Sequence, residues 1–168
     1  MKRFMLVVVL FVCTTFAYSQ KSICGVDFGS SYESAKSILE RKFGEAASYG
    51  HNEIWYRGKT YAGLVFDDIY FGFQADINRT YFNKCFFVRE EKNVQSCKHF
   101  LHLLLSKLKV KYDTEMHEEF DENGFYYAWG GHSPTSEEDI GFRVFVVKDK
   151  IYQIFLTYGD YDYINEEF

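Results

Sequence analysis

Two histidines three residues apart, His99 and His102, are the first candidates for chemistry. Residues at this spacing lie near each other on a helix, so both imidazoles can reach one metal ion. The H-E-x-x-H pattern that a zinc protease needs is missing. Because Leu101 and Leu104 mark the core side of this segment, His99 points away from the core and His102 lies on the flank. We expect both histidines to be solvated, and we predict no metal and no cofactor.

A second candidate is the acidic stretch from residue 113 to residue 123, whose carboxylates are potential calcium ligands. An EF-hand loop needs alternating oxygen ligands and a closing glutamate, and the residues from Asp121 onward supply neither at the required spacing. We therefore expect a charged, solvated connection.

A histidine stands beside a serine in Gly130-Gly131-His132-Ser133. This is not the G-x-S-x-G pattern of a nucleophilic serine, and adjacent residues rarely point at each other as base and nucleophile. We expect a glycine-rich loop and predict no catalytic residue. The alternative is a small periplasmic hydrolase or metal-dependent enzyme, in which His132, Ser133 and the acidic stretch belong to a site that the sequence does not identify.

Aromatic side chains are the most informative excess in the composition, with 18 Phe, 14 Tyr and 2 Trp making up 20% of the chain. A sheet covered by helices on one face needs apolar residues only at alternate strand positions. Residues 142–147 and 151–158 are apolar at both parities, so aromatic surface is also expected on the face away from the helices. Tyr and Trp suit recognition of proteins or glycans, because each combines a large ring with a polar group.

We expect this second face to bind a protein or a cell-envelope component through Trp129, Arg143, Phe145, Gln153 and Phe155. The alternative is a curled or better-covered sheet that buries both of its faces.

Three apolar residues, Phe100, Leu103 and Val110, lie off the main stripe of the segment that carries the two histidines. A helix that is apolar over much of its circumference is either deeply buried or covered by another chain. We expect Phe100 or Leu103 to contact another element or a second copy, and a homodimer is one form of that contact.

Two helices and a series of strands must position these residues. Ser30 and Glu33 form a capping box before a helical stripe that Gly44 ends, which predicts a helix over residues 31–43. A longer stripe follows Asn93 and predicts a helix over residues 93–111. Runs of β-branched and aromatic residues predict strands at 53–57, 60–66, 69–73, 81–88, 125–129, 140–148 and 151–158, with turns at 58–59, 67–68, 76–78 and 149–150.

The order helix, strands, helix, strands predicts an α+β fold. We expect two helix-plus-antiparallel-meander units, at about 25–90 and 91–160, that form one sheet with the helices on one face. The two units are pseudo-repeats in pattern only, since their sequences share little.

The stretch from Gly25 to Lys36, G-V-D-F-G-S-S-Y-E-S-A-K, resembles the opening of small secreted bacterial proteins of uncharacterised function. In those proteins a Gly-x-x-Phe-Gly lead-in precedes a capped helix and a meander. The tandem order also resembles the beta-lactamase inhibitor protein architecture and, more distantly, the small helix-sheet domains of outer-membrane assembly lipoproteins. The resemblance implies a fold and an exported location without catalytic chemistry. Inhibition of beta-lactamase is not implied, because no inhibitory loop matches residue by residue.

Residues 1–19 are expected to be a cleaved signal peptide, with a basic pair, an apolar run from Phe4 to Phe16 and a small-residue site that ends at Ser19. A lipid anchor at Cys13 is the alternative, although Val12 precedes it where a lipoprotein signal has a small residue. Residues 20–168 are expected to form one domain in the periplasm or outside the cell, with no transmembrane segment.

Removal of the signal peptide leaves a net charge of about −7, which argues against nucleic acid as a partner. Three cysteines then remain, Cys24, Cys85 and Cys97, and an oxidising compartment permits one disulfide. The sequence leaves open all three pairings, as well as three buried thiols. The function predicted from these features is that of an exported, non-catalytic binding module.

Overall fold

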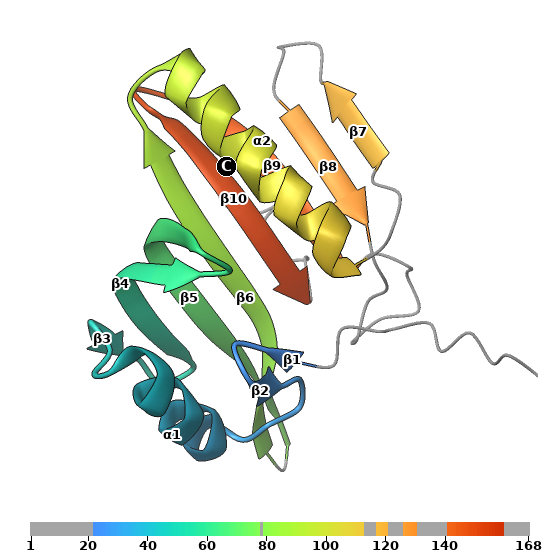
Figure 1. Cartoon of the computed structure of the whole chain (residues 1–168). Helices are drawn as coiled ribbons and strands as arrows, with labels where there is room; N and C mark the ends of the chain where they lie inside the picture. The colour runs from blue at the N-terminus through green and yellow to red at the C-terminus, as the bar shows by residue number, and fades with distance from the viewer. Residues whose placement is uncertain (1–21, 78, 113–116, 121–125, 131–140, 160–168) are drawn as a thin grey trace, which may run out of the picture.

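The computed structural model describes residues 22–77, 79–112, 117–120, 126–130 and 141–159, and it belongs to the α+β class (Figure 1). The two helices are α1 (Tyr32–Phe43) and α2 (Val94–Tyr112). One antiparallel sheet has the strand order β3-β4-β5-β6-β10-β9-β8-β7. Its strands are β3 (Ser48–Tyr49), β4 (Glu53–Tyr61), β5 (Leu64–Asp76), β6 (Arg79–Glu91), β7 (His117–Phe120), β8 (Tyr126–Gly130), β9 (Phe142–Lys148) and β10 (Tyr152–Gly159). The predicted fold class and the large antiparallel sheet are confirmed.

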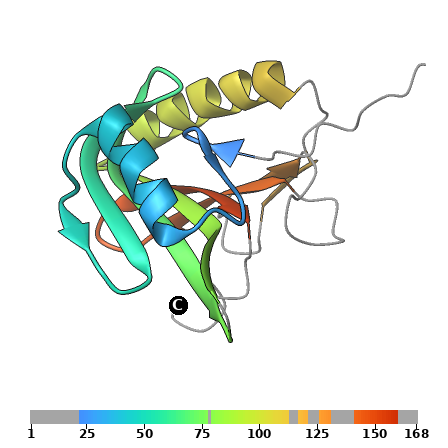
Figure 2. The same ribbon diagram turned by 90° about the horizontal axis from the view of Figure 1, so that it is seen from below.

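A short hairpin of β1 (Ser22–Ile23) and β2 (Val26–Asp27) precedes α1 and lies between the two helices (Figures 1 and 2). This hairpin and β3 were not predicted, because two-residue strands carry no hydrophobic periodicity. Strand β7 lies in the acidic stretch that was expected to be a connection, so that expectation is wrong for residues 117–120.

Both helices begin at a side-chain cap. The Ser31 hydroxyl accepts a hydrogen bond from the Ser34 N–H at 3.4 Å, so the cap of α1 is one residue later than the predicted Ser30. In α2 the Asn93 side chain accepts from the Ser96 N–H at 2.9 Å. Gly44 follows α1 with a φ of 79°, which glycine adopts without strain.

Two of the predicted turns lie inside strands. Residues 58–59 were expected to be a turn, but they lie inside β4, and the chain reverses at Ala62-Gly63 instead. Asp67 and Asp68 were also expected to be a turn, and they lie inside β5. The reason is a corner in this hairpin. Phe66 and Ile69 are both buried with two half-buried aspartates between them, which breaks the alternation of a straight strand.

Beyond this corner the end of the β4–β5 hairpin curls over β6 (Figure 1). Tyr61 stacks on Phe87 of β6 with ring centroids 4.4 Å apart, and Phe66 meets Phe100 of α2 edge-on at 5.6 Å. The Lys111 amine at the end of α2 donates to the Tyr61 hydroxyl at 2.7 Å. The hairpin end therefore packs between the central strand and α2.

The core is built on a row of cross-strand neighbours, Phe71, Cys85, Tyr158 and Phe142. Helix α1 reaches this side of the sheet through Phe43, whose ring lies 6.5 Å from that of Phe71. Helix α2 reaches it through Tyr112, which stacks on Phe142 at 5.1 Å. We call this side the core face.

Candidate functional site

Aromatic residues also occupy the strand positions that alternate with the core. Trp55, Tyr70 and Phe86 are cross-strand partners on β4, β5 and β6. The rings of Trp55 and Tyr70 meet edge-on at 5.0 Å, and those of Tyr70 and Phe86 stack at 5.3 Å with their planes 11° apart. Each of these three residues is half-buried, so the rings line the opposite face of the sheet without being sealed inside.

The same row continues across the second half of the sheet. Phe86 pairs with Thr157 of β10, Thr157 with Arg143 of β9, and Arg143 with Trp129 of β8. The His117 ring on the edge strand β7 stacks on Trp129 at 5.1 Å. One row of residues thus spans the sheet from β4 to β7.

A second ring pair lies beside this row. Phe145 and Phe155 are cross-strand partners, and their rings stack at 4.8 Å and 6°. Gln153, two residues before Phe155, donates from its side-chain amide to the Glu90 carboxylate at 3.2 Å. Because strand side chains alternate, the register puts all five predicted binding residues on one face, and each is half-buried. We call this side the aromatic face.

The prediction missed Trp55, Tyr70 and Phe86, which extend the aromatic face over the first half of the sheet. A local signal was available. Tyr70 and Phe86 each have an apolar residue directly before and after them in the sequence, as Phe145 and Phe155 do, so apolar side chains point to both faces of the sheet there. The pairing of β6 with β10, which brings Phe86 next to the predicted residues, has no such signal.

A hollow of about 290 Å³ lies at the β4 end of the aromatic face. Ala47, Ser48, Trp55 and Arg57 line it, and Arg57 forms an ion pair with Asp68 at 3.3 Å. The hollow combines an indole ring with a largely exposed guanidinium group, which suits an apolar side chain next to a hydrogen-bond acceptor.

The candidates for metal or nucleophilic chemistry do not converge. Among the described residues, no three His, Cys, Asp or Glu side chains are grouped to hold a metal ion, and His99 and His102 are exposed on α2. His132 and Ser133 lie outside the described residues. Burial raises the pKa of the Cys24 thiol to about 12 and that of the Cys85 thiol well above its usual 9.0. Both thiols are therefore protonated at neutral pH, and neither is an activated nucleophile.

The three predicted interface residues on α2 separate into two kinds. Phe100 is only 8% exposed, because it packs against Phe66 of the same chain. Leu103 is 38% exposed and Val110 is 86% exposed. Of the three, only Leu103 and Val110 are exposed apolar residues.

The chain matches no known protein-family model, and comparisons with curated proteins and with solved structures find no significant match. The resemblance to small secreted bacterial proteins and to the beta-lactamase inhibitor architecture therefore stays a prediction. Within the described part of the chain, neither helix has the length and apolar character needed to cross a membrane.

Proposed function

We propose that the chain is an exported, non-catalytic binding module that recognises a protein of the cell envelope through its aromatic face. The observation that carries this proposal is the row that runs from Trp55 to Trp129, in which every residue except the buried Thr157 is half-buried, with the half-buried Phe145–Phe155 pair beside it. An antiparallel sheet with one face in the core normally carries polar residues on the other. Large rings there are expected where a partner covers them.

The proposal includes a finer view of the fold, in which both helices cover the core face. Phe43 of α1 contacts Phe71, and Tyr112 of α2 contacts Phe142, and the register joins these two residues in one row. Each helix and the strands that follow it form one unit. The two units meet where β6, the last strand of the first, pairs with β10, the last strand of the second. This arrangement leaves the aromatic face to the partner.

A protein is a better occupant than a glycan because of how the rings are oriented. Tyr70 and Phe86 turn their flat faces toward each other, as do Phe145 and Phe155, so their edges point outward. Stacking of a sugar requires a flat aromatic face, whereas protein side chains pack well against ring edges. Polar groups near the rings, such as those of Arg57 and Gln153, would fix the orientation of the partner.

Photo-crosslinking in the cells that make this chain tests the proposal. The photoreactive residue p-benzoylphenylalanine replaces Phe145 in one variant and Trp55 in another, and Val110 on α2 in the control. The expected result is one protein adduct of the same mass from both aromatic-face positions, identified by mass spectrometry, and none from position 110. Equal adducts from all three positions, or none from the first two, would contradict the proposal.

A second measurement separates the aromatic face from the rest of the surface. Phe145→Ser should weaken capture of the identified protein at least tenfold, because it removes one ring of a stacked pair. Val110→Ser, which changes an apolar residue that is 86% exposed, should leave capture unchanged. Circular dichroism of both variants checks that they are folded. An adduct with an envelope polysaccharide in place of a protein would overturn the choice of partner.

A further inference from the structure

One edge of the sheet is formed by a very short strand. Strand β3, Ser48–Tyr49, is the outermost neighbour of β4 and pairs there with Ile54 and Trp55 (Figure 1). Strand β4 continues beyond these pairs to Tyr61. Among the described strands, none covers the outer side of this later part of β4.

The backbone groups of β4 alternate between its two sides. The Glu53 carbonyl accepts a hydrogen bond from the Gly50 N–H at 2.9 Å. The Trp55 carbonyl accepts one from the Ala47 N–H at 2.8 Å, so both carbonyls face the β3 side. Arg57 follows at the same parity, and its N–H and C=O point to that side as well. No described residue forms a backbone hydrogen bond with Arg57 there, so this residue presents one donor and one acceptor at the open edge.

A bulge turns the chain away from this edge just before β3. Ser48 lies opposite Trp55 in the register, and the preceding Ala47 donates to the same residue, so two residues oppose one. Ala46, the next residue back, packs against the core instead. Further along β4, the Lys59 amine donates to the carbonyl of the last α1 residue at 2.6 Å. The open edge is therefore short and is bounded at both ends.

The hollow of about 290 Å³ lies at this open edge, because its lining residues Ala47, Ser48, Trp55 and Arg57 are those that border the bulge. The Arg57 side chain is 80% exposed, although its Nε lies 3.3 Å from Asp68. A guanidinium group carries several N–H donors, so an ion pair through Nε leaves others for a second acceptor. Backbone groups, an indole ring and a cation are thus available within one small region.

We propose that the partner protein adds an extended segment to β4 at Arg57, with a glutamate or aspartate opposite that residue. This binding mode rests on the proposed function and specifies which part of the partner is recognised. The Arg57 N–H donates to the carbonyl of the acidic residue, whose own N–H donates to the Arg57 carbonyl. Opposite residues of such a pair lie on the same face, so the carboxylate meets the Arg57 guanidinium in the hollow.

The open edge and the hollow favour this occupant for separate reasons. A donor and an acceptor on one strand residue match the N–H and C=O of another extended backbone. The methylene stem of an acidic side chain packs against the Trp55 indole, while its carboxylate supplies the acceptor that a guanidinium group binds best. A basic residue opposite Arg57 would instead place two like charges side by side, which is destabilising.

A displayed library of random octapeptides, selected on the immobilised full chain, supplies the probe. We expect the selected peptides to share one Glu or Asp, and fluorescence polarisation of a labelled copy gives its Kd. N-methylation of the shared acidic residue removes the N–H that reaches the Arg57 carbonyl and should weaken binding at least roughly tenfold. N-methylation of the next residue is the matched control. Because that N–H points away from β4, binding should change less than about threefold.

Variants of the chain separate the side chain from the backbone. Arg57→Ala keeps the backbone groups and removes the guanidinium, and it should weaken the peptide roughly tenfold. Arg57→Pro also removes the outward N–H and should weaken it further, since a proline is tolerated at an edge where this N–H has no partner in the sheet. Arg79→Ala, which changes another exposed arginine, should leave the Kd unchanged. Circular dichroism checks the fold of each variant.

Equal binding by the two N-methylated peptides would overturn strand addition, and so would peptides that bind Arg57→Ala as tightly as wild type. A library that yields no binder would overturn it as well. Each of these results is compatible with crosslinks from Phe145 and Trp55 to an envelope protein, in which case the proposed function stands without this binding mode. Absence of both crosslinks together with the expected N-methylation pattern would refute the envelope partner and keep the peptide site.

Discussion

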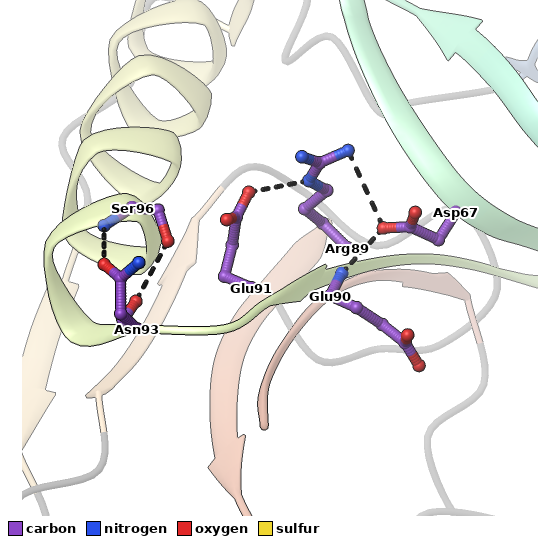
Figure 3. Close-up of polar contacts among 6 residues, drawn as sticks. All are labelled: Asp67, Arg89, Glu90, Glu91, Asn93 and Ser96. Carbon is purple, nitrogen blue, oxygen red and sulfur yellow. Dashed lines mark hydrogen bonds and ion pairs between the residues drawn. The ribbon is translucent and has the colours of Figure 1, made fainter. Parts of the chain in front are cut away.

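Asp67 Oδ2 accepts a hydrogen bond from the backbone N–H of Glu90 at 2.7 Å, so a side chain replaces a strand neighbour where β5 leaves β6 (Figure 3). Arg89 connects this corner to the start of α2. One of its guanidinium nitrogens lies 3.7 Å from Asp67, and its Nε donates to Glu91 at 2.8 Å. The guanidinium group also lies over the Phe100 ring, 5.4 Å from the centroid. These contacts hold the bent hairpin against the helix.

Replacing the capping aspartate should destabilise the corner. Asp67→Ala leaves the Glu90 N–H and the Arg89 guanidinium without this acceptor, and we expect a loss of about 1–2 kcal/mol in the free energy of unfolding. Asp68→Ala is the matched control, because Asp68 pairs with the largely exposed Arg57, and its loss should cost less than about 1 kcal/mol. Urea denaturation of both variants measures the difference. Equal losses of unfolding free energy in the two variants would show that the Asp67 side chain does not replace a strand neighbour of β6.

Acid should weaken the link between the corner and α2. Burial raises the pKa of the Glu91 carboxyl, but hydrogen bonds from Ser96 and Arg89 and the charge of Arg89 outweigh it, so the pKa lies below its usual 4.5. Because the pKa is lower in the folded state, the ionised carboxylate stabilises the fold above pH 4.5. This contribution is lost as the pH falls through the folded-state pKa.

Glu91→Gln removes this titration. The difference in unfolding free energy between wild type and Glu91→Gln should therefore be constant near neutral pH and shrink between about pH 5 and pH 3. Ser96→Ala removes one hydrogen bond to the Glu91 carboxylate. Its difference in unfolding free energy from wild type should also shrink at acid pH, by a smaller amount. Urea titrations at several pH values give these curves, and curves that stay parallel down to pH 3 would contradict the assignment.

The turn at the end of the β4–β5 hairpin can be improved. Ala62 has a φ of 49°, which is strained for a residue with a Cβ, and Gly63 follows with a φ of 75°. Ala62→Asn creates the Asn-Gly pair that this turn favours and should raise the free energy of unfolding by about 1 kcal/mol. Ala75→Asn makes the same change within β5 and should lower stability, because Asn is disfavoured in strands. A loss of stability in both variants would refute the strain at Ala62.

The apolar residues of α2 should differ in their contribution to stability. Phe100→Ala removes a buried ring that packs against Phe66 and Arg89, and we expect a cost of about 3 kcal/mol. Val110→Ala changes an exposed side chain and should stay within about 0.5 kcal/mol of wild type. Chemical denaturation at two protein concentrations also tests for a dimer. Dilution should lower the free energy of unfolding of a dimer. If it lowers that of wild type more than that of Val110→Ala, position 110 lies in an interface.

Local patterns predicted the helices well. The helical stripe before Gly44 and the one after Asn93 give α1 and α2 to within one residue at each end, because cap residues and apolar spacing act within a single turn. The strands were predicted in the right parts of the chain, but their boundaries were not predicted. Gly58 and the Asp67-Asp68 pair have the composition of a turn, and a corner between two bent strands uses the same residues for a different purpose.

The aromatic face could be predicted only in part. Phe145 and Phe155 were correctly assigned to one face, because strand alternation is a property of neighbouring residues. Thr157 lies next to Phe86 because β10 pairs with β6. These two residues are about 70 positions apart in the chain. No local signal specifies which distant strands pair, so the continuity of the row through both halves could not be foreseen.

The pairing of β10 with β6 also sets an order of events during biosynthesis. Strand β10, Tyr152–Gly159, follows the other described strands along the chain, yet it fills the middle of the sheet. Until it emerges, β6 has an open edge and the two halves of the molecule have no strand in common. The sheet can therefore be completed only after β10 has been synthesised, so the strands made before it wait for their central partner.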